Sequence, residues 1–263
     1  MRSIKLLLIA SLLSLSLPGL SGCSLLPDQI DNTKKWSADR FYTEAKDAMN
    51  SGDYEAAIKY FETLEARYPF GRYAQQAQLE VIYAYYKYNE PVSAVSAADR
   101  FIKLYPRHPF VDYAYYLKGL ANFNAGKGLF ERYLPQDASQ RDPGAARQSF
   151  QDFADLVKRF PNSKYTKDAT LRMAYLRNNL AKYEVNVANY YMKRGAFVAA
   201  ANRAKYVVEN YPRTPSVPDA LGILAKAYKV MELDDLSADA LRVLELNYPK
   251  HPALAQAKNT VVK

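Results

Sequence analysis

YEAAIKYFETLEARYP, residues 54–69, is the stretch that decides the fold of this 263-residue chain. Its large apolar residues recur every three or four positions, at Tyr54, Ile58, Phe61, Leu64 and Tyr68. That spacing gathers them on one face of a helix. Proline cannot continue a helix, because it lacks the backbone N–H and its ring clashes with the preceding turn. The stretch therefore predicts an amphipathic helix that ends at an aromatic-proline pair.

The same pair returns along the rest of the chain. The five copies are Tyr68-Pro69, Tyr105-Pro106, Phe160-Pro161, Tyr211-Pro212 and Tyr248-Pro249. The prolines are 37, 55, 51 and 37 residues apart, so the outer intervals are equal and the middle two contain extra residues. Gly52-Asp53 and Gly195-Ala196 allow the backbone to reverse between paired helices. Such a pattern is typical of tetratricopeptide repeats. We therefore predict an all-α fold, a right-handed superhelical solenoid of about five tetratricopeptide-like helix-turn-helix repeats.

Three local features refine this prediction. Residues 165–192 contain neither proline nor glycine and are apolar on more than one face, which predicts a long helix packed on two sides. Asp142-Pro143 and Thr214-Pro215 each predict a helix start, with a capping side chain before a first-turn proline. Residues 126–143 form an insertion in the third unit. We interpret it either as part of a binding face or as a tolerated surface loop.

The N-terminus has the pattern of a lipoprotein signal. A basic start and an apolar run of about 12 residues precede Leu20-Ser21-Gly22-Cys23, and this run is too short to span a bilayer. Cys23 is the single cysteine, and the motif resembles a bacterial lipobox, in which the thiol receives a diacylglycerol and the new amine is acylated. Ser24 follows Cys23. An aspartate at that position would by the usual rule retain a lipoprotein in the inner membrane, so the resemblance implies the periplasmic face of the outer membrane. A signal peptide cleaved elsewhere, leaving a free cysteine, is the alternative.

These patterns divide the chain into four segments. We predict a signal peptide over residues 1–22, a lipidated tether over 23–37, N-terminal repeats over 38–125 and C-terminal repeats over 126–263, the last including the insertion.

Few residues are suited to catalysis or metal binding. Only His108 and His251 are histidines, and a third equivalent loop has Thr214 in their place, so we interpret both as linker or cap residues. No phosphate loop, nucleophile elbow or helical zinc motif is present. We therefore expect no enzyme, no catalytic residue, no metal and no cofactor other than the covalent lipid. The formal net charge of +9 suits an acidic partner, and an envelope address argues against nucleic acid.

Two surfaces are candidates for partner binding. On the face of the first helices that usually lines a tetratricopeptide groove, we expect an extended peptide to meet Tyr42, Lys46, Tyr83 and Tyr86. Residues 193–213 contain five basic residues and one acidic residue: Lys193, Arg194, Arg203, Lys205, Arg213 and Glu209. This density of one charge favours docking on an acidic partner, with a solvated helix face as the alternative.

The whole region after the lipobox resembles the BamD family, tetratricopeptide lipoproteins of the β-barrel assembly machinery. The segments that carry the resemblance are residues 67–71, 82–86, 160–163, 180–184 and 194–199, with Asn202-Arg203. The resemblance implies a non-enzymatic scaffold. In this family the C-terminal repeats hold a periplasmic domain of BamA, other lipoproteins of the complex lie along the solenoid, and an N-terminal groove receives signals of unfolded outer-membrane proteins.

Carried onto this chain, the resemblance assigns two sets of site residues. The BamA-binding set is Arg203, Arg194 and Lys205. The client-signal set is Tyr68, Phe70, Tyr73 and Tyr83. The alternative function is a periplasmic lipoprotein that organises cell-wall or division enzymes through the same groove.

Overall fold

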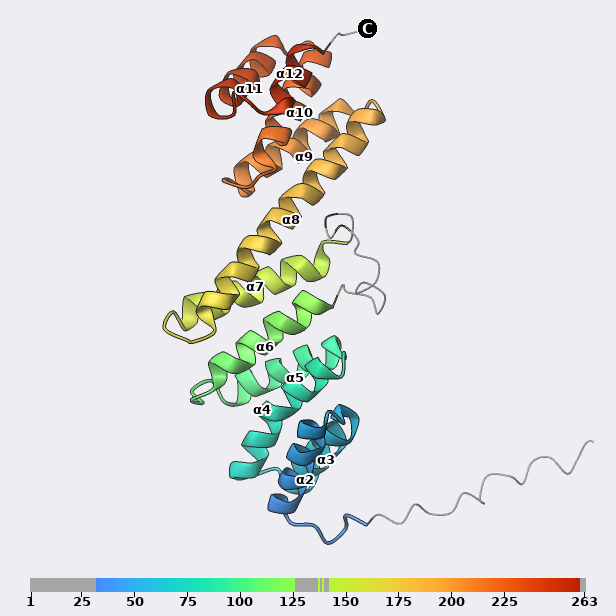
Figure 1. Ribbon diagram of the computed structural model, residues 1–263, viewed down its shortest axis with the longest axis vertical. Coiled ribbons are helices and arrows are strands. Elements are labelled where there is room, and N and C mark those ends of the chain that lie inside the picture. Colours follow the sequence, from blue (N-terminus) through green and yellow to red (C-terminus); the bar gives the residue numbers. More distant parts are fainter. Residues whose placement is uncertain (1–31, 126–136, 138, 140–141, 261–263) are drawn as a thin grey trace, which may run out of the picture. The chain divides into compact units, whose positions relative to one another are not determined.

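The computed structural model describes residues 32–125, 137, 139 and 142–260. The chain divides into two compact units, Met1–Ser37 and Ala38–Lys263. In the described end of the first unit, a turn is closed by the Trp36 N–H, which donates to the Thr33 carbonyl at 3.0 Å. The second unit contains all the helices named below, and no strand occurs in the described ranges (Figure 1). No helix among the described residues is long and apolar enough to cross a membrane.

The described residues of the second unit form eleven helices. In chain order they are α2 (Ala38–Ser51), α3 (Tyr54–Arg67), α4 (Arg72–Lys87), α5 (Pro91–Leu104), α6 (Val111–Asn124), α7 (Gly144–Arg159), α8 (Thr166–Lys193), α9 (Phe197–Asn210), α10 (Val217–Val230), α11 (Asp234–Asn247) and α12 (Pro252–Lys258).

The helices stack in chain order as five pairs. Each packs on the next, from α2 on α3 to α11 on α12, and Figure 1 shows this succession. The first helices of neighbouring pairs also touch, α2 with α4, α4 with α6 and α8 with α10. Contact between successive first helices is the packing by which helical repeats share one continuous core. The predicted all-α solenoid of tetratricopeptide-like pairs is confirmed, with α12 as an additional terminal helix.

The aromatic-proline pairs end the second helix of every pair. The C-cap residues are Tyr68, Tyr105, Phe160, Tyr211 and Tyr248, and each N–H donates to the carbonyl four residues earlier at 2.8 or 2.9 Å. The following proline has no N–H with which to extend the ladder. The aromatic residue therefore makes the last helical hydrogen bond, and the chain leaves the helix at the same point in all five units.

The glycine turns behave as predicted. Gly52 has φ +86° and Gly195 has φ +73°, values in the left-handed region that favours glycine. After Gly52, Asp53 caps α3, since its Oδ1 accepts from the Ala56 N–H at 3.0 Å. Each turn reverses the chain between the two helices of a pair.

Two predicted helix starts were wrong. Helices α7 and α10 begin at Gly144 and Val217, one and two residues after the prolines of Asp142-Pro143 and Thr214-Pro215, and neither has a side-chain cap. Thr214 lies two residues before Ser216, the N-cap residue of α10, and its hydroxyl donates to the Tyr211 carbonyl at 2.9 Å. The long helix predicted over residues 165–192 is confirmed as α8, which packs on α7, α9 and α10.

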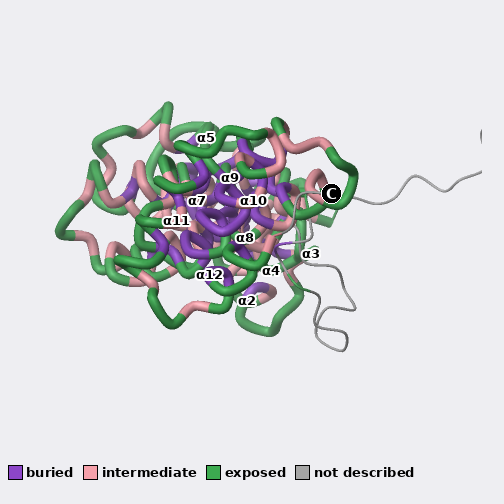
Figure 2. The backbone as a smooth tube through the Cα atoms, turned by 90° about the horizontal axis from the view of Figure 1, so that it is seen from above, coloured by how far each residue is buried: buried purple, intermediate pink, exposed green. Residues whose placement is uncertain are grey.

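The core runs through the middle of the helix stack, as the buried residues in Figure 2 show. Phe41, Phe61, Phe101 and Phe153 are fully buried. In the third pair, a Cβ added to Gly119 would lie 2.5 Å from Phe153 Cε1, so the glycine allows α6 and α7 to approach closely. The Ser149 hydroxyl also donates to the Gly119 carbonyl at 2.9 Å.

Candidate docking surfaces

The three residues of the proposed BamA-binding set lie in different environments. Arg203 is in the middle of α9, and Lys205 is two positions further on, so the two do not share a helix face. Lys205 pairs with Glu209 at 3.6 Å in an exposed contact. Arg194 is the C-cap of α8, with its guanidinium 5.3 Å from the centre of the Tyr190 ring. The basic cluster in the sequence is therefore spread around two helices.

Arg203 belongs to an ion network inside the repeat stack. Its Nη1 donates to Oε2 of Glu184 in α8 at 2.9 Å, and Nη2 of Arg147 in α7 donates to Oε1 of the same carboxylate at 3.0 Å. The Glu184 side chain is 1% exposed, whereas the side chains of Arg147 and Arg203 are 48% and 45% exposed. The hydrogen bond with Glu184 raises the pKa of Arg203 above its usual value. The network joins three consecutive helices, and Arg203 therefore has a structural partner.

Sequence reasoning missed Glu184 and Arg147. A usable signal was present, because Glu184 lies within the buried stripe of α8 formed by Leu180, Ala181, Val185 and Ala188. A carboxylate in such a stripe is expected to have a buried cationic partner. What the sequence could not provide is the position of that partner, 37 residues earlier.

The four residues of the client-signal set do not form a single cluster. Tyr68 and Phe70 lie at the connection between α3 and α4, and the Phe70 side chain is 90% exposed. Tyr73 is the second residue of α4, and its hydroxyl donates to Asp39 of α2. Tyr83 is ten residues further along α4, about 15 Å away along the helix axis at 1.5 Å per residue. Tyr68, Phe70 and Tyr73 thus mark one end of α4, and Tyr83 lies near the other.

Half-buried tyrosines lie at both of these ends. At one end, the Tyr42 ring lies 5.5 Å from that of Tyr73. At the other, the centres of the Tyr83 and Tyr86 rings lie 6.4 Å apart. In α6, burial raises the pKa of Tyr113, and the nearby Tyr165, Glu80 and Tyr83 raise it further. We call the residues Tyr42, Tyr73, Tyr83, Tyr86, Tyr113, Tyr116 and Tyr165 the tyrosine face.

The tyrosine face continues to the start of α8. The Tyr165 ring stacks on the rings of Tyr116 and Tyr113, with distances between ring centres of 4.6 and 5.3 Å. Across α2 and α4, Lys46 Nζ and Glu80 Oε1 form an ion pair at 3.0 Å. Lys46, expected to line the groove, is therefore paired with Glu80.

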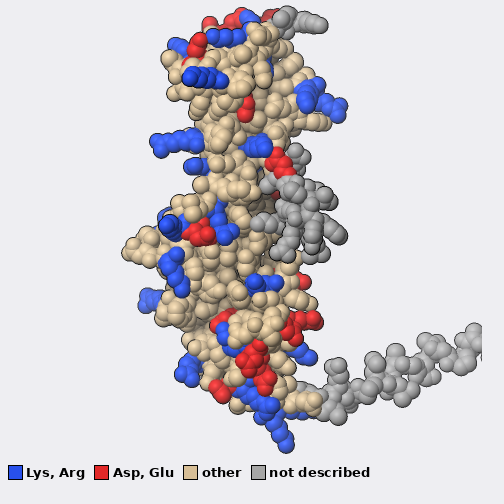
Figure 3. Space-filling view, in the orientation of Figure 1, with Lys and Arg blue, Asp and Glu red and all other residues tan. Residues whose placement is uncertain are grey.

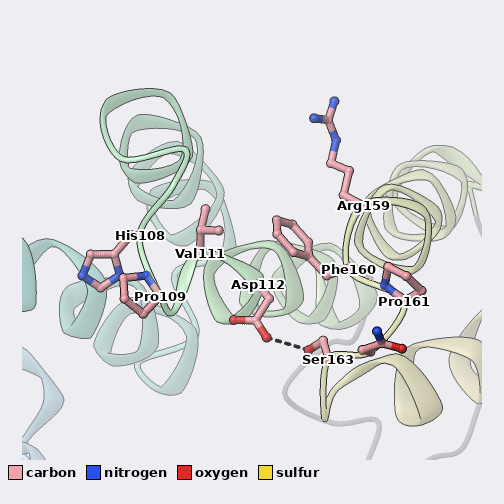
Figure 4. Close-up of a pocket in the computed structure, with 9 residues that line it drawn as sticks. His108, Pro109, Val111, Asp112, Arg159, Phe160, Pro161 and Ser163 are labelled. Atoms are coloured by element: carbon pink, nitrogen blue, oxygen red, sulfur yellow. Dashed lines mark hydrogen bonds between the residues drawn. The ribbon is translucent and has the colours of Figure 1, made fainter.

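An open pocket of about 390 Å³ lies between two connections of the helix stack (Figure 4). His108 and Pro109 line one side, and Phe160 and Pro161 line the other. The Ser163 hydroxyl donates to Asp112 Oδ2 at 2.6 Å, which ties the two connections together. None of the predicted site residues lines this pocket. We regard it as the gap left where two repeats meet.

The histidines have the structural roles predicted for them. His108 Nδ1 accepts from the Phe110 N–H at 3.2 Å. His251 is the N-cap of α12 and accepts from the Ala253 N–H at 3.3 Å. Within the described residues, no group of three or more His, Cys, Asp or Glu side chains could hold a metal ion.

Charge is distributed rather than concentrated. Figure 3 shows lysine and arginine side chains along the whole of the face drawn, not in one patch. Cys23 and most of the insertion lie outside the described residues. The described Asp137 forms an ion pair with Lys182 of α8, in which Oδ2 lies 2.6 Å from Nζ.

Comparisons with known proteins agree on one family. A family model described as YfiO, outer membrane lipoprotein, matches residues 34–244. The outer membrane protein assembly factor BamD of Neisseria gonorrhoeae is 48% identical over 96% of this chain and 94% of its own. BamD of Vibrio cholerae is 36% identical over 91% of this chain and 97% of its own.

Among solved structures, the MamA protein aligns over 86% of this chain and 98% of its own, with a TM-score of 0.39 and 14% identity. The sequence relationship is sufficient, because the family model covers most of the chain and the relatives match it over nearly their whole length. The chain therefore belongs to the YfiO family of outer membrane lipoproteins, which includes the BamD assembly factors.

Proposed function

We propose that this protein is a non-enzymatic, lipid-anchored scaffold for the assembly of outer-membrane β-barrel proteins. Relatives that match it almost end to end are named outer membrane protein assembly factors. The observation that carries the proposal is the tyrosine face, continued by the 90% exposed Phe70. Tyrosine and phenylalanine on a rigid helix stack provide apolar binding area at a small entropic cost.

The tyrosine face suits an unfolded barrel segment. Barrel strands alternate apolar and polar residues and carry aromatic residues at both membrane interfaces. An extended segment of this kind can pack its aromatic side chains on the rings of α2, α4 and α6, while its backbone and polar side chains meet tyrosine hydroxyls. We infer that Phe70, Tyr68 and Tyr73 hold one end of such a segment and Tyr83 contacts a position further along it.

This assignment can be tested by site-specific crosslinking of an unfolded barrel protein to the lipidated chain in membranes. Phe70→Ala should reduce crosslinking severalfold, because it removes the most exposed ring. Val92→Ala in α5 is the matched control, since Val92 is also exposed, at 77%, and lies outside the tyrosine face. Equal crosslinking by the Phe70 and Val92 variants would contradict the assignment.

The second half of the proposal is docking on BamA through the α8 and α9 region. Arg203 supports it, because an exposed guanidinium already oriented by Glu184 can bind a carboxylate with two parallel hydrogen bonds. Arg194 at the end of α8 and Lys205 on another face of α9 add positive charge to this region. Other lipoproteins of the assembly complex are further partners in this proposal.

The anchor completes the proposal. Cys23 lies outside the described residues, and we infer from its lipobox position that acyl chains on it hold the protein at the periplasmic face of the outer membrane. Two acyl chains suffice for stable attachment to a bilayer.

A tagged pull-down from detergent-solubilised envelopes tests the function as a whole. We expect BamA and other barrel-assembly subunits to be recovered. Arg203→Lys keeps a charge for Glu184 but lacks the planar guanidinium, and it should lower the recovery of BamA. Arg242→Lys in α11, at an arginine 71% exposed, should not. Recovery of cell-wall synthases or hydrolases in place of BamA would show that the scaffold serves a different pathway.

A further inference from the structure

One buried carboxylate holds two half-exposed arginines that come from different helices. Glu184 lies in α8, and its two oxygens are each bound by one arginine, Arg147 from α7 and Arg203 from α9. Both N–O distances are close to 3 Å, at 3.0 and 2.9 Å. The carboxylate is almost completely buried, so its position is fixed by the core, and it fixes the direction of both guanidiniums in turn.

The charges do not cancel. Two guanidiniums against one carboxylate leave a net charge of +1. A guanidinium has five N–H donors, and the hydrogen bond with Glu184 uses one of them on each arginine. Since each side chain is nearly half exposed, the remaining donors can face solvent. The arrangement therefore has one unit of positive charge and several donors for a group outside the chain.

Several tyrosines lie near enough to the two arginines to interact with them electrostatically. Tyr191 and Tyr183 act electrostatically on Arg203, whose pKa is raised chiefly by its hydrogen bond with Glu184. The pKa of Tyr211 is raised, first by burial and then by Tyr206, while Arg147 lowers it. Arginine and tyrosine are the residue types enriched at energetically important positions of protein interfaces.

We propose that Arg147 and Arg203 form a two-arginine clamp, oriented by Glu184, that binds one carboxylate side chain of an acidic protein partner across α7 and α9. A single carboxylate matches the residual charge of the clamp, and its two oxygens match two converging guanidinium forks. This inference rests on the proposed function in one respect, namely that the partner is BamA. It adds Arg147 as a contact residue and gives Glu184 the role of a positioning residue.

A simple arginine deletion would not test the clamp, because it leaves a buried carboxylate with one partner fewer and perturbs the fold. The experiment therefore starts from Glu184→Gln, which neutralises that carboxylate and keeps its shape. In this background, Arg147→Met and Arg203→Met each remove a guanidinium and keep the apolar stem. Arg242→Met in the same background is the matched control. Affinity for purified, detergent-solubilised BamA is measured for the full lipidated chain, and far-UV circular dichroism confirms the helix content of each variant.

We expect Arg147→Met and Arg203→Met each to weaken BamA binding about tenfold relative to Glu184→Gln alone, the size of one charge-assisted hydrogen bond. If Arg147 served only to neutralise Glu184, Arg147→Met would cost nothing once Glu184 is glutamine, and the clamp would be refuted. A loss confined to the Arg203 variant would also refute the clamp while leaving BamA docking in place.

Two further outcomes are informative. If neither arginine variant weakens binding, BamA docks elsewhere on the chain and the clamp is wrong. If the wild-type chain does not bind BamA, both the clamp as a BamA site and the docking part of the proposed function are wrong. Should the double variants fail to fold, Arg147→Lys in the wild-type chain replaces them. Lysine retains a charge for Glu184 and lacks the planar fork, so the clamp predicts severalfold weaker binding and an unchanged fold.

Discussion

The stability of the N-terminal repeats should fall as the pH rises from 4.5 to about 7, because of Glu65. The Glu65 side chain in α3 is only 15% exposed, and burial is the main reason that its pKa rises from the usual 4.5 to about 7. Arg100 acts in the opposite direction at 3.4 Å. The ion pair with Arg100 does not outweigh the effect of burial on the pKa of Glu65. Arg100 is itself 54% exposed and contacts only Oε2, while the buried Oε1 has no hydrogen-bond partner.

The direction of this pH dependence follows from the difference between the folded and unfolded pKa values of Glu65. The folded state binds the Glu65 proton more tightly than the unfolded state, so the folded state is favoured below pH 4.5 and loses this advantage as the pH rises to about 7 and above. A shift of that size corresponds to at most about 3 kcal/mol, and residual solvent screening reduces it to about 2 kcal/mol. Glu65→Gln cannot ionise and should abolish this dependence.

Urea unfolding followed by far-UV circular dichroism at pH 5.0 and pH 8.5 measures the effect. Relative to wild type, Glu65→Gln should gain about 2 kcal/mol of unfolding free energy between the two pH values. Glu209→Gln, at a glutamate whose side chain is 58% exposed, is the control and should show no such gain. If the difference between Glu65→Gln and wild type is the same at both pH values, the ion pair with Arg100 outweighs burial and the reasoning is refuted.

Three further predictions concern packing, capping and the anchor. Gly119→Ala should destabilise the fold by about 1–3 kcal/mol by forcing the buried Phe153 ring to move, seen as a lower thermal midpoint, and an unchanged midpoint would contradict the close approach. Asp53→Ala should cost about 1 kcal/mol by removing the cap on the Ala56 N–H, measured in the same way, whereas Asp53→Asn should cost less. Cys23→Ala should leave the circular dichroism spectrum unchanged and move the protein from the membrane to the soluble fraction; retention in the membrane would indicate a different anchor.

The repeat architecture was predictable because its signals are local. The aromatic-proline pair sets the last hydrogen bond of each second helix, and Gly52 and Gly195 reverse the chain, so a short window of sequence contains the cause of each feature. The two helix starts predicted from Asp142-Pro143 and Thr214-Pro215 failed by one or two residues. Helices α7 and α10 begin at Gly144 and Val217, so their N-cap residues are Pro143 and Ser216 rather than Asp142 and Thr214.

The candidate sites were less predictable because they depend on side chains far apart in sequence. Arg203 and Lys205 are close in the sequence, yet helix periodicity places them on different faces. Conversely, Arg147 and Arg203 are 56 residues apart and meet at one carboxylate. Only the stacking of α7, α8 and α9 brings these two arginines together, and no sequence motif predicts their contact with one carboxylate.

The uninterrupted helix α8 has a mechanical consequence. It runs for 28 residues without glycine or proline, about 42 Å at 1.5 Å per residue, so it has none of the usual points at which a helix bends. Asp168, which accepts a hydrogen bond from Tyr116 of the tyrosine face at 2.7 Å, lies in its first turn, and Glu184 lies in its second half. The two arginines and the tyrosine face therefore both contact one continuous helix, and we expect a displacement of α8 at Glu184 to move Asp168 as well.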